Sequence, residues 1–154
     1  MTLKFKIVNK KEFERKIDLK NKRLLNNIIK VVRVTANEVR NTAIESIVQN
    51  PRAGEAVTRY DPKRSIRISK EGDPPAGDTG FLASNIHLVF DADLLGANVE
   101  SRAKYSHFLE FGTKDMVARP FMQPALEKGR AKYRRIFKKA VKDSIWKNSI
   151  KKMN

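Results

Sequence analysis

A long apolar stripe with helical spacing is the feature that most constrains the fold of this chain. Its residues mostly lie three or four positions apart, which places them on one face of an α-helix. Asn9 and Glu12 have capping-box spacing, so we expect the helix to start near Lys10 and to end before Asn50–Pro51. It would be about 57 Å long, and a kink near Asn26–Asn27 is one option. The stripe comprises Phe13, Ile17, Leu24, Ile28, Val32, Ala36, Val39, Ala43 and Ile47.

Shorter patterns predict strands and a second long helix. Apolar residues alternate with polar ones over residues 3–7, which favours a strand, and residues 86–90 and 97–102 read as a β-hairpin. A short helix is expected over 105–111, ending at Gly112, followed by an extended segment from Thr113 to Phe121. Pro124 suits the first turn of the last helix. That helix has an apolar face of Leu126, Tyr133, Phe137, Ala140, Val141 and Ile145.

Proline and glycine punctuate residues 50–77, which we expect to form a long irregular loop that becomes ordered on assembly. Ile66 and Ile68 allow one short strand within it. The order of elements predicts an α+β fold, with the long N-terminal helix and the C-terminal helix packed on a small antiparallel β-sheet. We expect a single domain over residues 1–154, with a frayed basic tail at 147–154.

The chain is strongly basic, with 33 Lys and Arg against 17 acidic residues and a net charge of +16. This charge favours a polyanionic partner, although solvated lysines on helix faces would give the same excess. From Lys128 to Lys152 there are eleven basic residues and one acid, Asp143. Cysteine is absent, which excludes disulfides and thiolate metal sites. No apolar run is long enough to predict a membrane span, and the N-terminus lacks the pattern of a secretory signal.

Catalytic chemistry is poorly supported. The two histidines, His87 and His107, have no acid or nucleophile at a spacing that would form a metal site or a catalytic group. We therefore expect no enzymatic activity and no cofactor. A basic, sequence-independent nucleic-acid-binding protein remains an alternative, and a small basic RNase is a weaker one.

Three sequence blocks in residues 74–141 resemble the neck or tail-completion proteins of long-tailed phages, the group that includes the lambda minor tail protein Z. Residues 78–86 (DTGFLASNI) are similar to that family's TG-x-L-x-x-S-I, although Asn85 is an insertion in the pattern. Residues 105–113 (YSHFLEFGT) are similar to Y-A-x-x-x-E-F-G-T, and residues 118–126 (ARPFMQPAL) to A-R-P-F-x-x-P-A-L.

The resemblance implies a structural virion protein of a tailed phage or prophage. Such a protein would form a ring, of six copies by analogy, at the head–tail junction after synthesis in the host cytoplasm. Its partners would be itself, neighbouring head-closure or connector proteins, tail-terminator or tail-tube proteins, and DNA passing through the lumen. The residues that carry the motif are assigned a structural or assembly role: Thr79, Gly80, Leu82, Ser84, Tyr105, Glu110, Phe111, Gly112, Thr113, Arg119, Pro120, Phe121 and Pro124.

Physical roles can be predicted for some of these motif residues. Gly112 should adopt the left-handed conformation and so end the short helix. Pro120 and Pro124 should stiffen the segment that leads into the last helix. Phe111 and Phe121 are expected to anchor that path to the sheet. Glu110 and Arg119 are hypothesised to form an ion pair, within a subunit or between subunits. The long helix and the 50–77 segment are the candidates for contact with neighbouring proteins.

Overall fold

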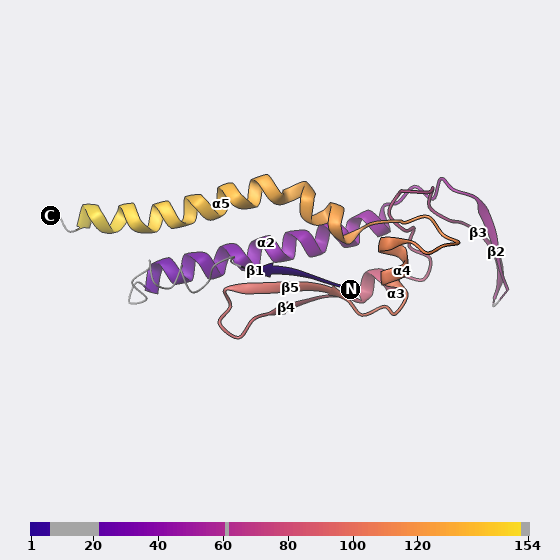
Figure 1. Ribbon diagram of the computed structural model, residues 1–154, viewed down its shortest axis with the longest axis horizontal. Helices are drawn as coiled ribbons and strands as arrows, with labels where there is room; N and C mark the ends of the chain where they lie inside the picture. Colours follow the sequence, from indigo (N-terminus) through magenta and orange to yellow (C-terminus); the bar gives the residue numbers. More distant parts are fainter. Residues whose placement is uncertain (7–21, 61, 152–154) are drawn as a thin grey trace.

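The computed structural model describes residues 1–6, 22–60 and 62–151. Within these residues, five strands form two antiparallel sheets, one of order β1-β5-β4 and one of order β2-β3. The two long helices lie on one side of the larger sheet, with α2 next to the sheet, which confirms the predicted α+β class (Figure 1). In chain order the elements are β1 (Thr2–Lys6), α2 (Lys22–Val48), β2 (Ala56–Tyr60), β3 (Lys63–Arg67), α3 (Phe81–Ser84), β4 (Ile86–Phe90), β5 (Gly96–Ser101), α4 (Ser106–Phe111) and α5 (Met122–Lys151).

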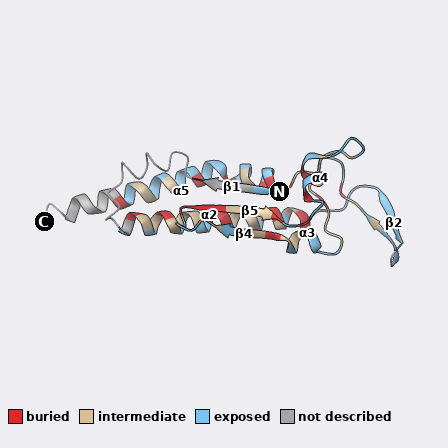
Figure 2. Ribbon diagram, turned by 60° about the horizontal axis from the view of Figure 1, so that its bottom comes forward, coloured by how far each residue is buried: buried red, intermediate tan, exposed pale blue. Residues whose placement is uncertain are grey.

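Helix α2 packs against both the larger sheet and α5, so its apolar face forms the centre of the core (Figures 1 and 2). The predicted stripe is confirmed over α2, where Leu24, Ile28, Ala36, Val39, Ala43 and Ile47 are all buried. Val39, Ala43 and Ile47 meet Ile86 and Val99 of the sheet in the main apolar cluster. The expected start of this helix near Lys10, with Asn9, Phe13 and Ile17, lies outside the described residues.

Polar contacts fix how α2 and α5 lie against each other. The Asn27 side-chain amide donates a hydrogen bond of 2.7 Å to Ser144 Oγ, and Lys132 Nζ lies 2.6 Å from Glu38 Oε1. Helix α2 continues through Asn26 and Asn27, so it does not break there. Gly129 leaves room for the ring of Tyr133, because a Cβ at that position would lie 2.0 Å from it. Helix α5 reaches Lys151, well into the expected frayed tail.

The larger sheet agrees with the strands expected from the alternating patterns. Strands β4 and β5 form the predicted hairpin, and β1 pairs with β5 so that Leu3 lies opposite Val99. Ala97, Val99 and Ser101 are buried at alternate positions of β5, as expected for a strand with one face against a helix. Ile7, the last residue of the predicted first strand, lies outside the described residues.

The 50–77 segment contains a hairpin where the sequence suggested at most one strand. Ile66 lies in β3 as expected, but β2 was not predicted and Ile68 falls just past the strand. Every residue of β2 is exposed, so it has no buried face and no apolar alternation that would reveal it. The hairpin extends beyond the helices and the larger sheet, and we call β2 and β3 together the arm (Figure 1).

Candidate assembly site

The three motif blocks meet at one end of the molecule, close to the base of the arm (Figure 1). The first block, with Thr79, Gly80, Leu82 and Ser84, forms α3 and its approach. The second, from Tyr105 to Thr113, forms α4 and its end, and the third leads through Arg119 and Pro120 into α5. Residues far apart in the sequence thus form a single region, consistent with a shared structural role.

Glu110 caps the N-terminus of α5. Its side chain is only 4% exposed, and Oε2 accepts hydrogen bonds from the backbone N–H groups of Phe121 (2.9 Å) and Met122 (3.0 Å). Oε1 accepts a third, from the N–H of Gln123, at 2.9 Å. The first N–H groups of a helix have no partner within the helix, and their partial positive charge favours a carboxylate. Glu110 therefore holds α4 and α5 together.

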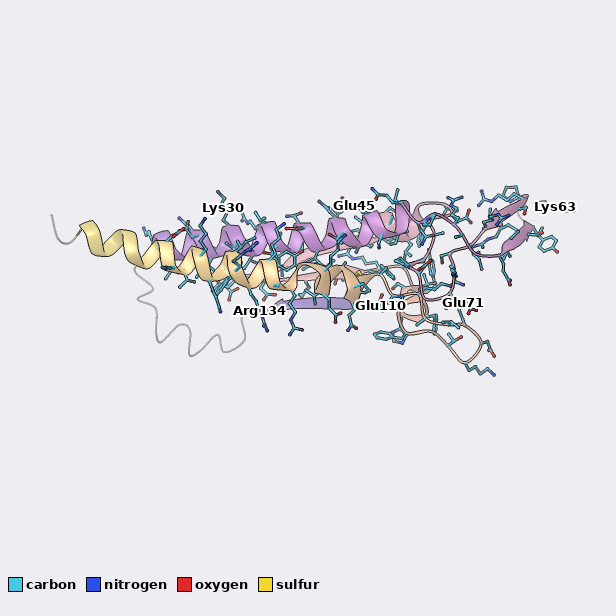
Figure 3. All side chains as sticks on the ribbon, turned by 90° about the horizontal axis from the view of Figure 1, so that it is seen from above. Lys30, Glu45, Lys63, Glu71, Glu110 and Arg134 are labelled. Atoms are coloured by element: carbon cyan, nitrogen blue, oxygen red, sulfur yellow. The ribbon has the colours of Figure 1, made fainter. Side chains whose placement is uncertain are left out.

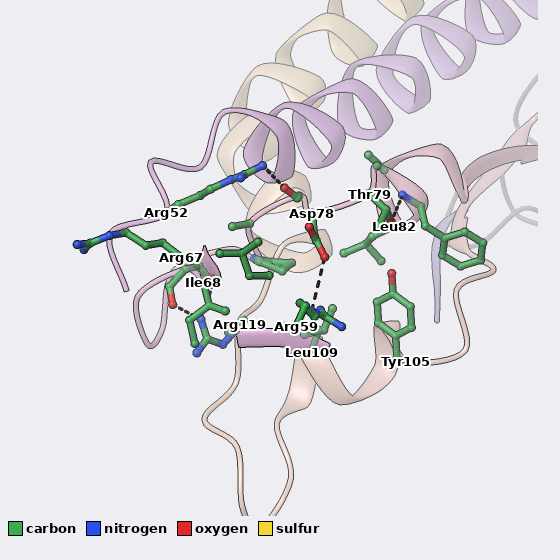
Figure 4. Close-up of a pocket in the computed structure, with 18 of the residues that line it drawn as sticks. Arg52, Arg59, Arg67, Ile68, Asp78, Thr79, Leu82, Tyr105, Leu109 and Arg119 are labelled. Atoms are coloured by element: carbon green, nitrogen blue, oxygen red, sulfur yellow. Dashed lines mark hydrogen bonds and ion pairs between the residues drawn. The ribbon is translucent and has the colours of Figure 1, made fainter. Parts of the chain in front are cut away.

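The hypothesised Glu110–Arg119 ion pair is wrong within the subunit. Arg119 Nη1 instead donates to the carbonyl oxygen and hydroxyl of Ser69 and, at 3.3 Å, to the carbonyl oxygen of Lys70 (Figure 4). Its backbone N–H donates to Leu109 O at 2.6 Å. Both Glu110 oxygens are already engaged in a buried position, which also argues against a pair across a subunit boundary. Arg119 ties the base of the arm to α4.

Asp78, from the first block, lies between two arginines of the arm. Arg59 and Arg64 are directly opposite each other in the β2–β3 pairing, where like charges repel. Asp78 Oδ1 lies 2.8 Å from Arg64 Nη2, and Oδ2 lies 3.6 Å from Arg59 Nε (Figure 4). Gly80 occupies the N-cap of α3, at φ 78°. Asp78 pairs with the two arginines of the arm.

Gly112 ends α4 as predicted, but in a different conformation. Its φ of 76° and ψ of −178° lie in a region open essentially to glycine, not in the left-handed helical region. A Cβ there would also lie 2.8 Å from Met116 O and 2.9 Å from Ala118 N. The backbone approaches so closely because Thr113 and Met116 pair across a tight turn. The extended path predicted from Thr113 is therefore wrong over its first four residues.

Aromatic side chains cover the outer side of α3 and α4, and we call Phe81, Tyr105, Phe108 and Phe111 the aromatic patch. Each is at least 43% exposed. The rings of Phe81 and Tyr105 lie 6.3 Å apart, and His107 lies 5.0 Å from the ring of Phe111. Phe121 is fully buried, as predicted for an anchor, but Phe111 is 58% exposed and anchors nothing. Sequence reasoning missed the patch because its helical spacing is also that of a buried stripe.

A cavity of about 690 Å³ separates the arm from α3 and α4 (Figure 4). Four arginines line it: Arg52, Arg59, Arg67 and Arg119. The guanidinium groups of Arg52, Arg59 and Arg119 have protein partners, which are Gly77 O, Asp78 and Ser69. Burial raises the pKa of Tyr105 above 10.0, and Arg59 opposes this shift. No group of metal-ligating side chains occurs in the described part of the chain. The cavity is thus a gap between the arm and helices α3 and α4.

Residues 11–112 match the family model HK97-gp10_like, described as "Bacteriophage HK97-gp10, putative tail-component". The match covers well over half of the chain.

The chain belongs to the HK97-gp10-like family.

The broader expectation of a phage tail-associated structural protein is therefore confirmed. The matched region contains α2, the arm, α3, β4, β5 and α4, and it ends at Gly112. The third motif block, including Arg119, Phe121 and Pro124, lies beyond it. No curated protein and no solved structure matched the chain. None of the helices among the described residues is long and apolar enough to cross a membrane.

Proposed function

We propose that this family member is a non-enzymatic subunit of a ring at the head–tail junction of a tailed phage or prophage, of the kind represented by the lambda minor tail protein Z group. The ring joins the head to the tail tube and lets DNA pass through its lumen. Six copies form it. The other partners are a head-closure or connector protein and a tail-terminator or tail-tube protein.

The observation that carries the proposal is the presence of two different exposed surfaces at one end of the molecule, one aromatic and one that mixes apolar and basic side chains. One is the aromatic patch. The other is the arm, where Val57 is 40% and Tyr60 82% exposed. An isolated two-stranded hairpin is marginally stable in water, so an arm that extends from the body gains stability from a partner that covers it. A closed ring with head-to-tail contacts needs two unlike, complementary surfaces on each subunit.

The roles assigned to the motif residues follow from this arrangement. Glu110 and Gly112 set the position of α4, and α4 presents the aromatic patch. Asp78 and Arg119 hold the base of the arm in place. The motif therefore builds the frame that positions both contact surfaces, and in the proposed ring the patch of one copy meets the arm of the next.

Replacing Phe108 and Phe111 together by serine tests this proposal. Both side chains point into solvent in the single chain, so the double variant should fold normally and fail to assemble. The matched control replaces Val34 and Val89, two exposed apolar residues outside the patch, by serine. Light scattering after size-exclusion chromatography and negative-stain microscopy report the particles. A wild-type chain that remains monomeric at high concentration, or a patch variant that still forms rings, would contradict the proposal.

The net charge favours a second candidate, a basic nucleic-acid-binding protein that acts without sequence preference. Under this alternative the chain would bind duplex DNA tightly as a monomer, with affinity that falls steeply as salt rises. Ring formation would be absent under the same conditions. The two candidates are therefore separated by the oligomeric state in which the wild-type chain binds DNA.

A further inference from the structure

The most strongly charged surface of the described chain lies on α5, away from the motif blocks. Between Lys128 and Lys142 there are eight Lys or Arg residues and no acid. All eight are exposed. Figure 3 shows one of them, Arg134, on the side of α5 that faces away from α2. The buried side of the same stretch includes Gly129 and Tyr133.

Helical spacing arranges these cations in two rows. Residues 128, 132, 135, 139 and 142 follow steps of four and three, so they form one row, and residues 130, 134 and 138 form a second beside it. The longer row extends over about 21 Å at 1.5 Å per residue. Only Lys132 of the eight forms an ion pair among the described residues, with Glu38. We call these eight residues the basic face.

The composition of the basic face argues against a protein partner. The cores of protein interfaces are depleted in lysine and enriched in aromatic side chains. None of the large apolar side chains exposed in the described structure lies on α5. The aromatic patch has the opposite character, so the two surfaces suit partners of different chemistry.

We infer that the basic face of α5 binds the phosphate backbone of duplex DNA without reading its sequence. Duplex DNA presents one negative charge per about 1.7 Å of its axis, a continuous line of charge along which a straight row of cations can lie. Binding of single strands commonly uses exposed aromatic rings for base stacking, and the described part of α5 exposes none. The inference deepens the proposed function and rests on it, since DNA passing through the neck would be the ligand.

The test replaces Arg134, Arg135, Lys138 and Lys139 by glutamine in the full chain. Glutamine has nearly the same helix propensity as Lys and Arg, so α5 should remain intact. Fluorescence anisotropy with a short random-sequence duplex should show affinity reduced by at least about tenfold at moderate salt. The slope of log K against log salt should fall by about 0.9 for each phosphate that the variant no longer neutralises.

The matched control replaces Lys30, Lys70, Lys104 and Lys114 by glutamine. These lysines are exposed, lie outside α5, and their replacement removes the same four charges. The control should keep most of the DNA affinity. An equal loss of affinity in both variants would show that only net charge matters and would overturn the inference. So would equally effective competition by polyglutamate at the same charge concentration, which would indicate an acidic protein as the partner.

Native mass spectrometry of the same samples separates this inference from the proposed function. The α5 variant should assemble like the wild type. If it loses assembly together with DNA binding, the basic face belongs to the subunit interface and the inference is wrong. If the wild type binds DNA through α5 but never assembles, the ring proposal fails while the phosphate-binding face stands.

Discussion

At the scale of single residues, the motif residues act through the backbone. Glu110 accepts hydrogen bonds from three backbone N–H groups, and Arg119 donates hydrogen bonds to carbonyl oxygens. Gly112 allows its backbone to lie close to that of Met116 and Ala118. The sequence suggested that Glu110 and Arg119 attract each other, because side-chain charge is visible in a sequence. Most of the partners they actually have are backbone groups, which every residue carries, so the identity of these partners depends on the fold.

Replacing Glu110 by alanine should lower the free energy of unfolding by about 2–4 kcal/mol, because several buried N–H groups of α5 lose their acceptor. Urea denaturation followed by circular dichroism measures the change. Glu45, exposed on α2, provides the control, and its replacement by alanine should change stability by less than about 0.5 kcal/mol. Equal effects of the two substitutions on the free energy of unfolding would show that the Glu110 cap does not stabilise the fold.

Tyr133 should make stability fall at alkaline pH. Burial raises the pKa of its phenol above 10.0, and nearby Glu38 raises it further. Because the folded-state pKa exceeds the unfolded one, the stabilisation is complete below pH 10 and is lost as pH rises through the folded pKa. Denaturation between pH 9 and 11 should show a steeper loss of stability for the wild type than for Tyr133→Phe. Tyr60→Phe, at an 82% exposed site, should behave like the wild type.

At the scale of elements, the sequence predicts those that bury one face. The α2 stripe and the β4–β5 hairpin are recognisable because water is excluded from one side of each, and the start of α5 is recognisable because Pro124 suits a first helical turn. The arm has no such side, and the Thr113–Met116 turn depends on Gly112 approaching Ala118. The exposure of Phe111 also explains why its predicted role as an anchor is wrong. Periodicity places residues on one face of a helix, but it does not say whether that face meets the core or a partner.

Asp78 should stabilise the closed conformation of the arm. Replacing it by asparagine removes the charge between Arg59 and Arg64, and their repulsion should open the hairpin more often. Partly exposed ion pairs contribute roughly 0.2–1 kcal/mol each, so tryptic cleavage within the arm should become about two- to fivefold faster. Glu71→Gln, at an exposed position before Asp78, serves as the control. Unchanged cleavage in Asp78→Asn would mean that other interactions hold the arm.

At the scale of the whole molecule, the aromatic patch and the basic face lie on different elements. The aromatic patch lies on α3 and α4 and just before α4, where the motif blocks meet, while the basic face extends along α5. A chain of net charge +16 repels its own copies, so subunit contacts need exposed apolar side chains such as those of the aromatic patch. This separation would let one protein contact neighbouring subunits and DNA at the same time.

Independent surfaces should give additive effects when both are changed. Combining Phe108→Ser and Phe111→Ser with the four glutamine substitutions on α5 should yield a folded monomer that binds DNA no better than the α5 variant. Distant sites without shared partners usually add to within about 0.5 kcal/mol in free energy, so the two effects should sum. DNA affinity is compared at a concentration where the wild type is also monomeric, since a ring would raise apparent affinity by presenting several basic faces. If the patch substitutions alone weaken DNA binding by monomers, the two surfaces are coupled, and the assignment of separate partners to them is wrong.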